Sequence, residues 1–182
     1  MKSSPVFLCL LVLALAVAPL VLGAEQAPEK RPTADEQTEA GFRLMKTELL
    51  GKLRFEMKAS EVVKAYGKPT AKGKMENWEG VGLYVQPWEY PELGVELQMA
   101  AEKKDGVQTV YMIKATKRCK LSTTHGVRIG SSEEEVAKAY GKLRGDESEA
   151  GKTFIAGSTV GGVIFGFKEG KVVSIFIGAA SE

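Results

Sequence analysis

Cysteine and histidine are scarce in this chain of 182 residues, which contains 2 cysteines and 1 histidine. Cys9 lies in an apolar stretch at the start of the chain and Cys119 lies far from it, so an internal disulfide framework like that of small secreted domains is excluded. A hydrophobic core must therefore hold the fold together. We interpret Cys119 as a buried small residue or an unused thiol, with an intermolecular disulfide as the alternative.

Sequence signatures of catalysis and metal binding are absent as well. The chain has no H-E-x-x-H, G-x-S-x-G, Walker or paired-cysteine spacing, and its only histidine, His125, lies in a turn-like segment. The glycine-rich residues 157–162 lack the Lys-Ser/Thr ending of a phosphate loop and precede a strand pattern, so they predict a hairpin turn. The acidic residues 133–135 favour the positive end of a helix without a metal. We therefore expect no catalytic residues, no metal site and no cofactor.

Neither sign of charge is in large excess. The chain carries 25 Lys and Arg against 23 Asp and Glu, a formal net charge of +2 at pH 7. Such a balance does not steer a polyanion toward the protein, and we expect no nucleic-acid partner.

A polar linker and a secretory leader are predicted at the start of the chain. Residues 6–22 are apolar apart from Cys9 and Pro19, and small residues follow at positions 23 and 24. This is the pattern of a signal peptide over residues 1–24, with cleavage after residue 23 or 24 and an uncleaved membrane anchor as the alternative. We therefore predict a periplasmic or secreted protein with no stable membrane insertion after cleavage. Residues 25–40 are polar and contain no aromatic residue, which predicts a flexible linker.

An internal repeat with an offset of 74 residues organises the rest of the chain. Residues 60–68 read SEVVKAYGK and residues 134–142 read EEVAKAYGK, so seven of nine aligned positions are identical. Apolar residues recur at helical spacing in both copies, and each helix is expected to press one tyrosine, Tyr66 or Tyr140, inward. A further short amphipathic helix is predicted over residues 41–50.

Residues that begin and end helices frame the two copies. Ser132 followed by Glu135 predicts a capping box at the start of the second helix. Gly67 and Gly141 are placed to end the two helices in the left-handed conformation.

Strand patterns follow each helix. They cover residues 83–85, 95–101 and 107–113 in the first copy, and residues 153–156, 163–167 and 172–177 in the second. The chain therefore predicts an α+β fold of two tandem repeats, each a short helix followed by a three-stranded antiparallel sheet. Repeat unit 1 covers residues 41–117 and repeat unit 2 covers residues 118–182, and the two sheets either join or pack in tandem.

The repeated motif resembles that of a known superfamily. Residues 126–142, GVRIGSSEEEVAKAYGK, and the strands after them resemble the repeats of the β-lactamase inhibitory proteins and of the small outer-membrane assembly lipoproteins of the SmpA/OmlA and BamE type. The resemblance covers residues 51–178 and implies helix-plus-three-strand units in tandem. It rests on core and capping positions, which say little about function. Glu56 stands where the second copy has Gly130, so the turns before the two helices are expected to differ.

Aromatic residues gather in one segment of the first copy, whereas the corresponding segment of the second copy is rich in glycine and serine. Such side chains often anchor protein or saccharide partners, and the alternative is that they fill a small core. The candidate binding residues are Trp78, Tyr84, Trp88 and Tyr90.

A basic cluster lies between the two copies. It could meet an anionic membrane or a cell-wall polymer, and the alternative is a solvated connection. Its residues are Lys114, Lys117, Arg118 and Lys120.

The sequence therefore predicts a non-enzymatic, extracytoplasmic module, of interaction or inhibitor type, that binds another extracytoplasmic protein. An envelope-assembly or structural factor associated with the outer membrane or cell wall is the alternative. A hydrolase would have to depend on His125, the only histidine.

Overall fold

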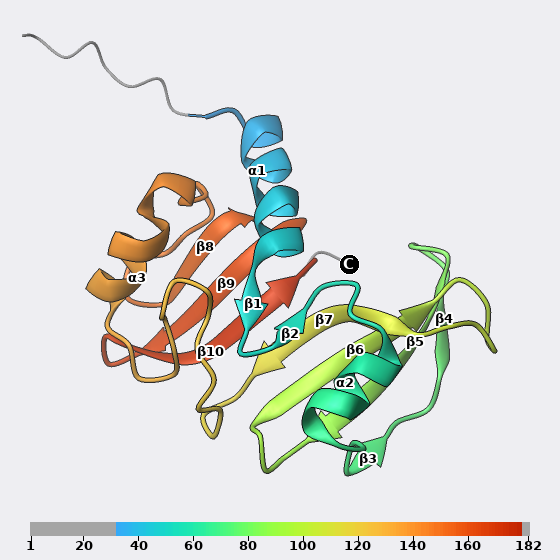
Figure 1. Cartoon of the computed structure of the whole chain (residues 1–182). Coiled ribbons are helices and arrows are strands. Elements are labelled where there is room, and N and C mark those ends of the chain that lie inside the picture. Colours follow the sequence, from blue (N-terminus) through green and yellow to red (C-terminus); the bar gives the residue numbers. More distant parts are fainter. Residues whose placement is uncertain (1–31, 180–182) are drawn as a thin grey trace, which may run out of the picture. The chain divides into compact units, whose positions relative to one another are not determined.

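A computed structural model describes residues 32–179 of the chain, and Figure 1 shows the arrangement of its elements. The predicted signal peptide and the first part of the predicted linker lie outside the described residues. The fold is α+β, as the sequence predicts. Its helices are α1 (Ala34–Thr47), α2 (Ala59–Tyr66), α3 (Glu133–Tyr140) and the 3-10 helix η1 (Gly141–Leu143). None of the helices in this part of the chain is long and apolar enough to cross a membrane.

One antiparallel sheet of eight strands forms the centre of the fold. Its order is β3-β5-β6-β7-β10-β9-β8, with β4 pairing β5 beside β3. Because β7 pairs with β10, the strands that follow α2 and those that follow α3 belong to one continuous sheet. A separate hairpin is made by β1 (Leu49–Leu50) and β2 (Leu53–Arg54). The strands of the large sheet are β3 (Ala71–Lys72), β4 (Glu76–Trp78), β5 (Leu83–Tyr90), β6 (Val95–Ala101), β7 (Thr109–Ala115), β8 (Thr153–Ser158), β9 (Gly161–Lys168) and β10 (Lys171–Gly178).

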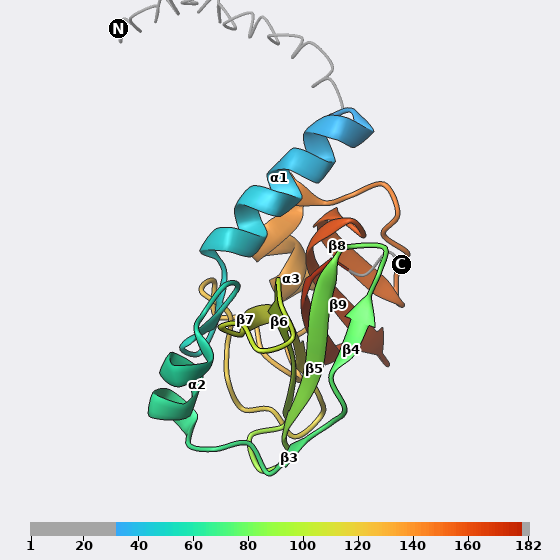
Figure 2. The ribbon, with the colours of Figure 1, turned by 90° about the vertical axis from the view of Figure 1, so that its right-hand side faces the viewer.

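The three α-helices lie on one side of this sheet, as Figures 1 and 2 show from two directions. Alternate residues of the strands face the helices and form the core, because successive side chains of a strand point to opposite faces. Fully buried members of this core include Leu50, Val62, Leu97, Val136 and Phe165. Among the described residues, no helix covers the opposite face of the sheet.

Helix α1 begins at Ala34, inside the segment predicted to be a flexible linker. Thr33 and Glu36 form a capping box, in which each side chain accepts a hydrogen bond from the backbone N–H of the other residue. The helix then packs on β8 and β9, where Gly41 comes so close that an added Cβ would collide with the backbone of Gly161. The linker prediction is therefore wrong for the residues of α1, because strands far along the chain stabilise a polar segment that could not bury a face alone.

The predicted helix ends are confirmed in part. Ser132 and Glu135 form the expected capping box at the start of α3. Gly67 has a positive φ of 81° but an extended ψ of −177°, so it is not in the left-handed helical conformation. Gly141 has φ −55° and ψ −34°, and the chain continues through it into η1. The left-handed conformation predicted for Gly141 is therefore wrong, since a 3-10 turn ends this helix instead.

The turns before α2 and α3 are alike rather than different. Glu56 has a φ of 59° and Gly130 has a φ of 90°. The backbone N–H of each donates to a strand carbonyl, that of Val110 for Glu56 and that of Val172 for Gly130, both at 2.8 Å. The glutamate thus occupies a backbone conformation that usually favours glycine.

Candidate functional site

Two of the four predicted aromatic binding residues belong to the core. Trp88 is 2 % exposed and Tyr90 is 6 % exposed, and both lie on the face of β5 that packs against the helices. The Trp88 indole N–H donates to Gln86 Oε1 at 3.2 Å, and the Tyr90 hydroxyl donates to the carbonyl of Gly67 at 3.1 Å. Their predicted binding role is therefore corrected to core filling. Trp78 and Tyr84 remain partly exposed.

An apolar groove of about 490 Å³ lies at the end of the sheet where β5 begins, β6 ends and β7 begins. We call it the β6–β7 groove. Its aromatic wall is made by Phe55, from the loop before α2, and Tyr111, from β7, whose ring centroids lie 6.2 Å apart. The Trp78 ring meets Tyr111 edge-on with centroids 6.4 Å apart, so it extends this wall from β4. Leu83 and Val107 add aliphatic side chains to the lining.

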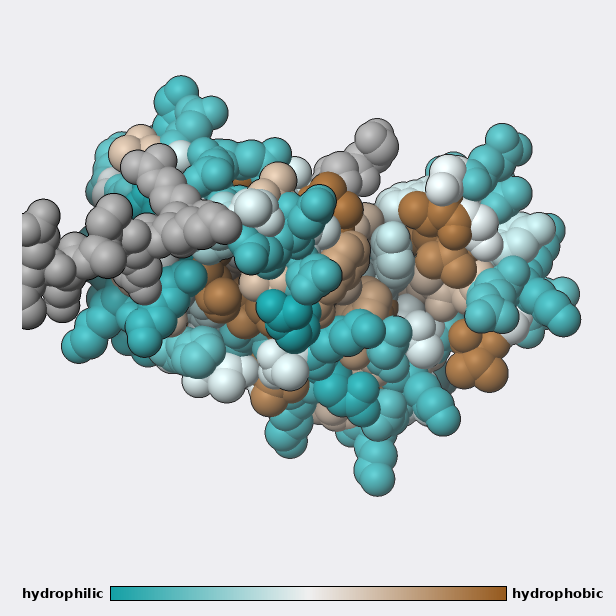
Figure 3. Space-filling view, turned by 90° about the horizontal axis from the view of Figure 1, so that it is seen from above, coloured by the Kyte–Doolittle hydropathy of each residue, from teal (hydrophilic) through white to brown (hydrophobic). Residues whose placement is uncertain are grey.

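Hydrophobic side chains are unusually exposed at this end of the sheet. Val107, in the connection from β6 to β7, is 75 % exposed, and Val81, in the turn from β4 to β5, is 49 % exposed. Figure 3 shows hydrophobic patches on the surface, separated by hydrophilic side chains. Exposed apolar groups beside an aromatic groove are typical of a surface that another molecule covers.

Charged side chains line the rim of the groove. Glu56, Glu102 and Lys103 are exposed there, which leaves one negative charge in excess. None of the three has an ion-pair partner within 4.0 Å among residues 32–179. Arg54, two residues before Glu56, pairs instead with Glu61 at 3.0 Å. The groove therefore combines an apolar lining and an aromatic wall with carboxylates that are free to pair with a cation.

The predicted basic cluster does not form one free patch. Lys114 lies opposite Glu96 on the neighbouring strand and pairs with it at 3.0 Å, so its charge is compensated. Lys117, Arg118 and Lys120 are exposed in the connection after β7. Arg118 also lines a small cavity of about 170 Å³. Three cations thus remain available to an anionic partner.

Cys119 is buried within this connection, which confirms its interpretation as a buried small residue. It is 4 % exposed, and its thiol is free. Burial raises the pKa of the Cys119 thiol above its usual value. A protonated, covered thiol is a poor nucleophile.

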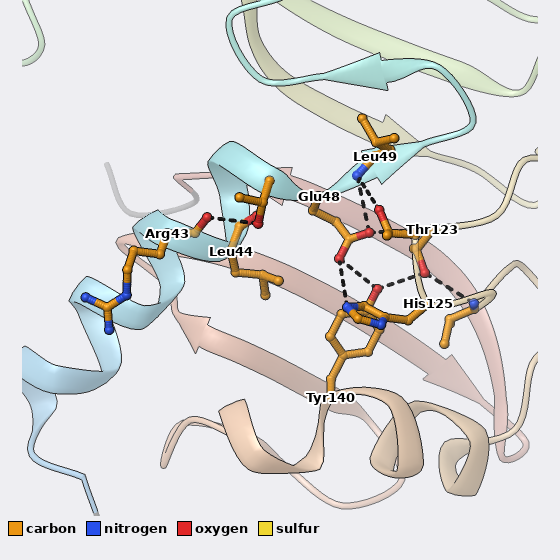
Figure 4. A network of polar contacts seen from close by, with 10 residues as sticks. Arg43, Leu44, Glu48, Leu49, Thr123, His125 and Tyr140 are labelled. Atoms are coloured by element: carbon orange, nitrogen blue, oxygen red, sulfur yellow. Dashed lines mark hydrogen bonds and ion pairs between the residues drawn. The ribbon is translucent and has the colours of Figure 1, made fainter.

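A buried carboxylate, which the sequence analysis did not single out, organises the junction of α1, the 122–127 loop and α3 (Figure 4). Glu48 follows α1 and is 1 % exposed. Its Oε1 accepts hydrogen bonds from the backbone N–H groups of Thr124 at 2.7 Å and Leu49 at 3.2 Å. Its Oε2 lies 3.0 Å from the Tyr140 hydroxyl, which is also 2.8 Å from Thr123 Oγ1. Because a carboxylate only accepts, the phenolic proton goes to Glu48, and Thr123 donates to the phenolic oxygen.

This network is satisfied by the protein itself. Burial and the nearby Glu48 carboxylate raise the pKa of Tyr140 well above its usual range, which keeps the phenol protonated. His125 stacks edge-on against Tyr140, with centroids 5.0 Å apart, and its Nε2 lies 4.0 Å from Glu48 Oε2. The histidine covers the buried carboxylate at the surface. The repeated tyrosine was the only signal of this network in the sequence, since Thr124 and Tyr140, which bind the Glu48 carboxylate, lie far along the chain.

The remaining polar candidates are structural. Residues 157–162 contain the turn between β8 and β9 and the strand ends that pair beside it, which confirms the hairpin prediction. Ser158 Oγ accepts from Thr38 of α1 at 3.2 Å. Within residues 32–179, no group of three or more His, Cys, Asp or Glu side chains is arranged to hold a metal ion.

Comparison of the chain with protein-family models, with curated proteins and with solved structures gave no match.

Proposed function

We propose that this chain is a non-enzymatic, extracytoplasmic module that binds a segment of another protein in the β6–β7 groove. The single observation that carries this proposal is the combination of an aromatic groove with the 75 % exposed side chain of Val107 at its edge. Interfaces are enriched in aromatic side chains, and a few such residues supply most of the binding energy. A groove of about 490 Å³ is large enough to take apolar side chains of a partner.

We also infer that the fold is built from two copies of one helix-plus-three-strand unit. In both halves the turn before the helix makes the same backbone hydrogen bonds to the last strand, and both last strands have an irregularity at the same place. This supports the tandem repeat that the sequence predicts. The matching donor and acceptor pairs are Glu56–Val110 and Gly130–Val172, followed by Ala59–Gln108 and Glu133–Gly170.

The groove is particular to the first copy. Phe55 corresponds to Ile129 in the repeat, and Tyr111, at the irregularity of β7, corresponds to Val173 in β10. Trp78 has no counterpart, since both tryptophans of the chain lie in the first copy. The second copy forms the same turn and strands without an aromatic wall, so folding of the unit does not need one. The aromatic wall of the first copy therefore favours a role in binding.

The test is affinity capture from an extracytoplasmic extract, followed by measurement of the dissociation constant with the purified partner. We expect Val107→Asp and Tyr111→Ala to weaken binding at least tenfold, since truncating a central interface residue costs about 2 kcal/mol or more. Val160→Asp is the matched control, because Val160 is 44 % exposed but lies on the turn between β8 and β9. Equal binding by all three variants and the wild type would refute the proposal.

A second candidate function, an envelope-assembly or structural factor, is favoured by the three exposed cations that remain in the connection. Lys117, Arg118 and Lys120 could hold the protein on an anionic surface, where each cation contributes about 1 kcal/mol. Fractionation of envelopes tests this. This role would be supported if the protein is recovered with the envelope at low salt and released at moderate salt. Replacing the three basic residues by Gln should also release the protein from the envelope.

A further inference from the structure

Glu56 occupies a backbone conformation that its side chain does not favour. Its φ of 59° lies in the left-handed region, where a Cβ is unfavourable and glycine is preferred. The corresponding residue of the second copy is Gly130, which makes the same hydrogen bond to the last strand. Strained residues of this kind point to a use for the side chain. Glu169 also has a positive φ, of 54°, in the tight turn between β9 and β10, so a positive φ alone does not mark a site.

Glu56 differs from Glu169 in lining the β6–β7 groove, directly after the aromatic residue Phe55. Its position is fixed, because its N–H donates to Val110 O at 2.8 Å and the backbone of Met57 accepts from Val110 N–H at 2.9 Å. Its carboxylate is exposed and has no ion-pair partner among the described residues. The backbone that carries this carboxylate is thus fixed at the edge of an apolar groove.

We propose that the groove takes a large apolar or aromatic side chain of a peptide segment, and that Glu56 pairs with a Lys or Arg of the same segment. This inference rests on the proposed function and names the chemistry of the partner. The charges on the rim support it, since the charged lining residues are two carboxylates, Glu56 and Glu102, and one ammonium group, Lys103. A basic side chain next to the apolar anchor would complete this charge pattern, whereas an acidic one would add to the negative excess.

The test is selection from a random dodecapeptide library displayed on phage, with wild-type protein as bait and the Val107→Asp variant as the counter-bait. Peptides that bind only the wild type depend on the groove. We expect these peptides to carry an aromatic or large aliphatic residue next to Lys or Arg. One selected peptide is then synthesised, and its dissociation constant is measured by calorimetry.

Variants at position 56 separate charge from shape. We expect Glu56→Gln to weaken binding of the selected peptide roughly two- to fivefold, as for an exposed ion pair, and Glu56→Lys to weaken it about tenfold. Replacing the basic residue of the peptide by Glu should restore its binding to Glu56→Lys. Glu169→Gln is the matched control, being a glutamate of positive φ away from the groove, and should bind like the wild type. Circular dichroism confirms that each variant is folded.

The outcomes distinguish this inference from the proposed function. If groove-dependent peptides show no preference for Lys or Arg and the Glu56 variants bind them unchanged, the pairing is refuted and the groove remains a binding site. If no selected peptide depends on Val107, both the pairing and the groove are refuted as the binding site for protein segments.

Discussion

Replacing Tyr140 by phenylalanine removes a single hydroxyl from the buried network around Glu48, and we expect this to lower the free energy of unfolding by about 2 kcal/mol. The hydroxyl lies 3.0 Å from the Glu48 carboxylate, and hydrogen bonds to charged groups contribute about 1.5–3 kcal/mol. Glu48 would keep its bonds from two backbone N–H groups, and Thr123 would lose the phenolic oxygen that it contacts at 2.8 Å. The ring itself, which is 1 % exposed, would still fill its place in the core.

The matched control is Tyr66→Phe in the first copy. The Tyr66 hydroxyl accepts a hydrogen bond from the backbone N–H of Lys52 at 2.7 Å at an exposed site, where water can replace it. We therefore expect Tyr66→Phe to cost less than about 1 kcal/mol. Both variants are measured by urea unfolding followed by circular dichroism, with equal m values as the test that only stability has changed. Equal losses for Tyr66→Phe and Tyr140→Phe would refute the reasoning. A double-mutant cycle with Glu48→Gln then measures how strongly Glu48 and Tyr140 are coupled.

Other consequences of the structure are open to measurement. The free energy of unfolding, measured by urea titration, should fall above about pH 9. A group whose pKa is raised in the folded state contributes its full stability below its unfolded pKa, and this contribution is lost as the pH rises toward the folded pKa. A free energy of unfolding that does not fall before pH 12 would contradict this. Gly41→Ala should lower the free energy of unfolding by about 1 kcal/mol or more, because its Cβ would meet the backbone of Gly161, whereas Gly80→Ala, with open space around it, should be neutral in the same assay. Glu56→Gly should raise the free energy of unfolding by about 0.5–1 kcal/mol and, with it, the melting temperature. A lower melting temperature of this variant would mean that Glu56 stabilises the turn. The groups whose pKa values are raised by burial, and which therefore cause the loss of stability at high pH, are Tyr90, Cys119 and Tyr140.

The elements that follow local patterns could be predicted from the sequence. The capping box of Ser132 and the helical spacing of apolar residues predicted α3, and alternation of apolar residues predicted β6 with its observed bounds. These signals are local. The capping box is a pair of hydrogen bonds within one helical turn, and the alternation of apolar residues lies within one strand. They also sufficed to predict the α+β class.

The start of α1 and the length of β5 could not be predicted in this way. Helix α1 depends on β8 and β9, which lie more than a hundred positions along the chain. Strand β5 was predicted only over residues 83–85, whereas it runs to Tyr90 and includes Pro87, a residue that is unusual within a sheet. Pro87 is accommodated because it lies between the short pairings of β5 with β3 and with β4, and its carbonyl accepts from Gly73. The missed alternation along β5 is also why Trp88 and Tyr90 were not assigned to the core.

The candidate site was predicted through one of its members. Trp78 was singled out because tryptophan is confined to one copy, and it does lie beside the groove. Phe55 and Tyr111 come from two distant segments, and no local pattern brings them together. The same holds for Glu48, whose carboxylate is buried only because the 122–127 loop and Tyr140 surround it.

The claim that the β6–β7 groove binds a protein segment is tested most directly by photo-crosslinking in the native compartment. A photoreactive amino acid replaces Val107, which is 75 % exposed beside the groove. In a second variant of the chain it replaces Val160, which is 44 % exposed on the turn between β8 and β9. We predict a discrete adduct with one extracytoplasmic protein from position 107, its loss when Tyr111→Ala is added, and no such adduct from position 160. The same adduct from both positions, or none from position 107, would contradict the account.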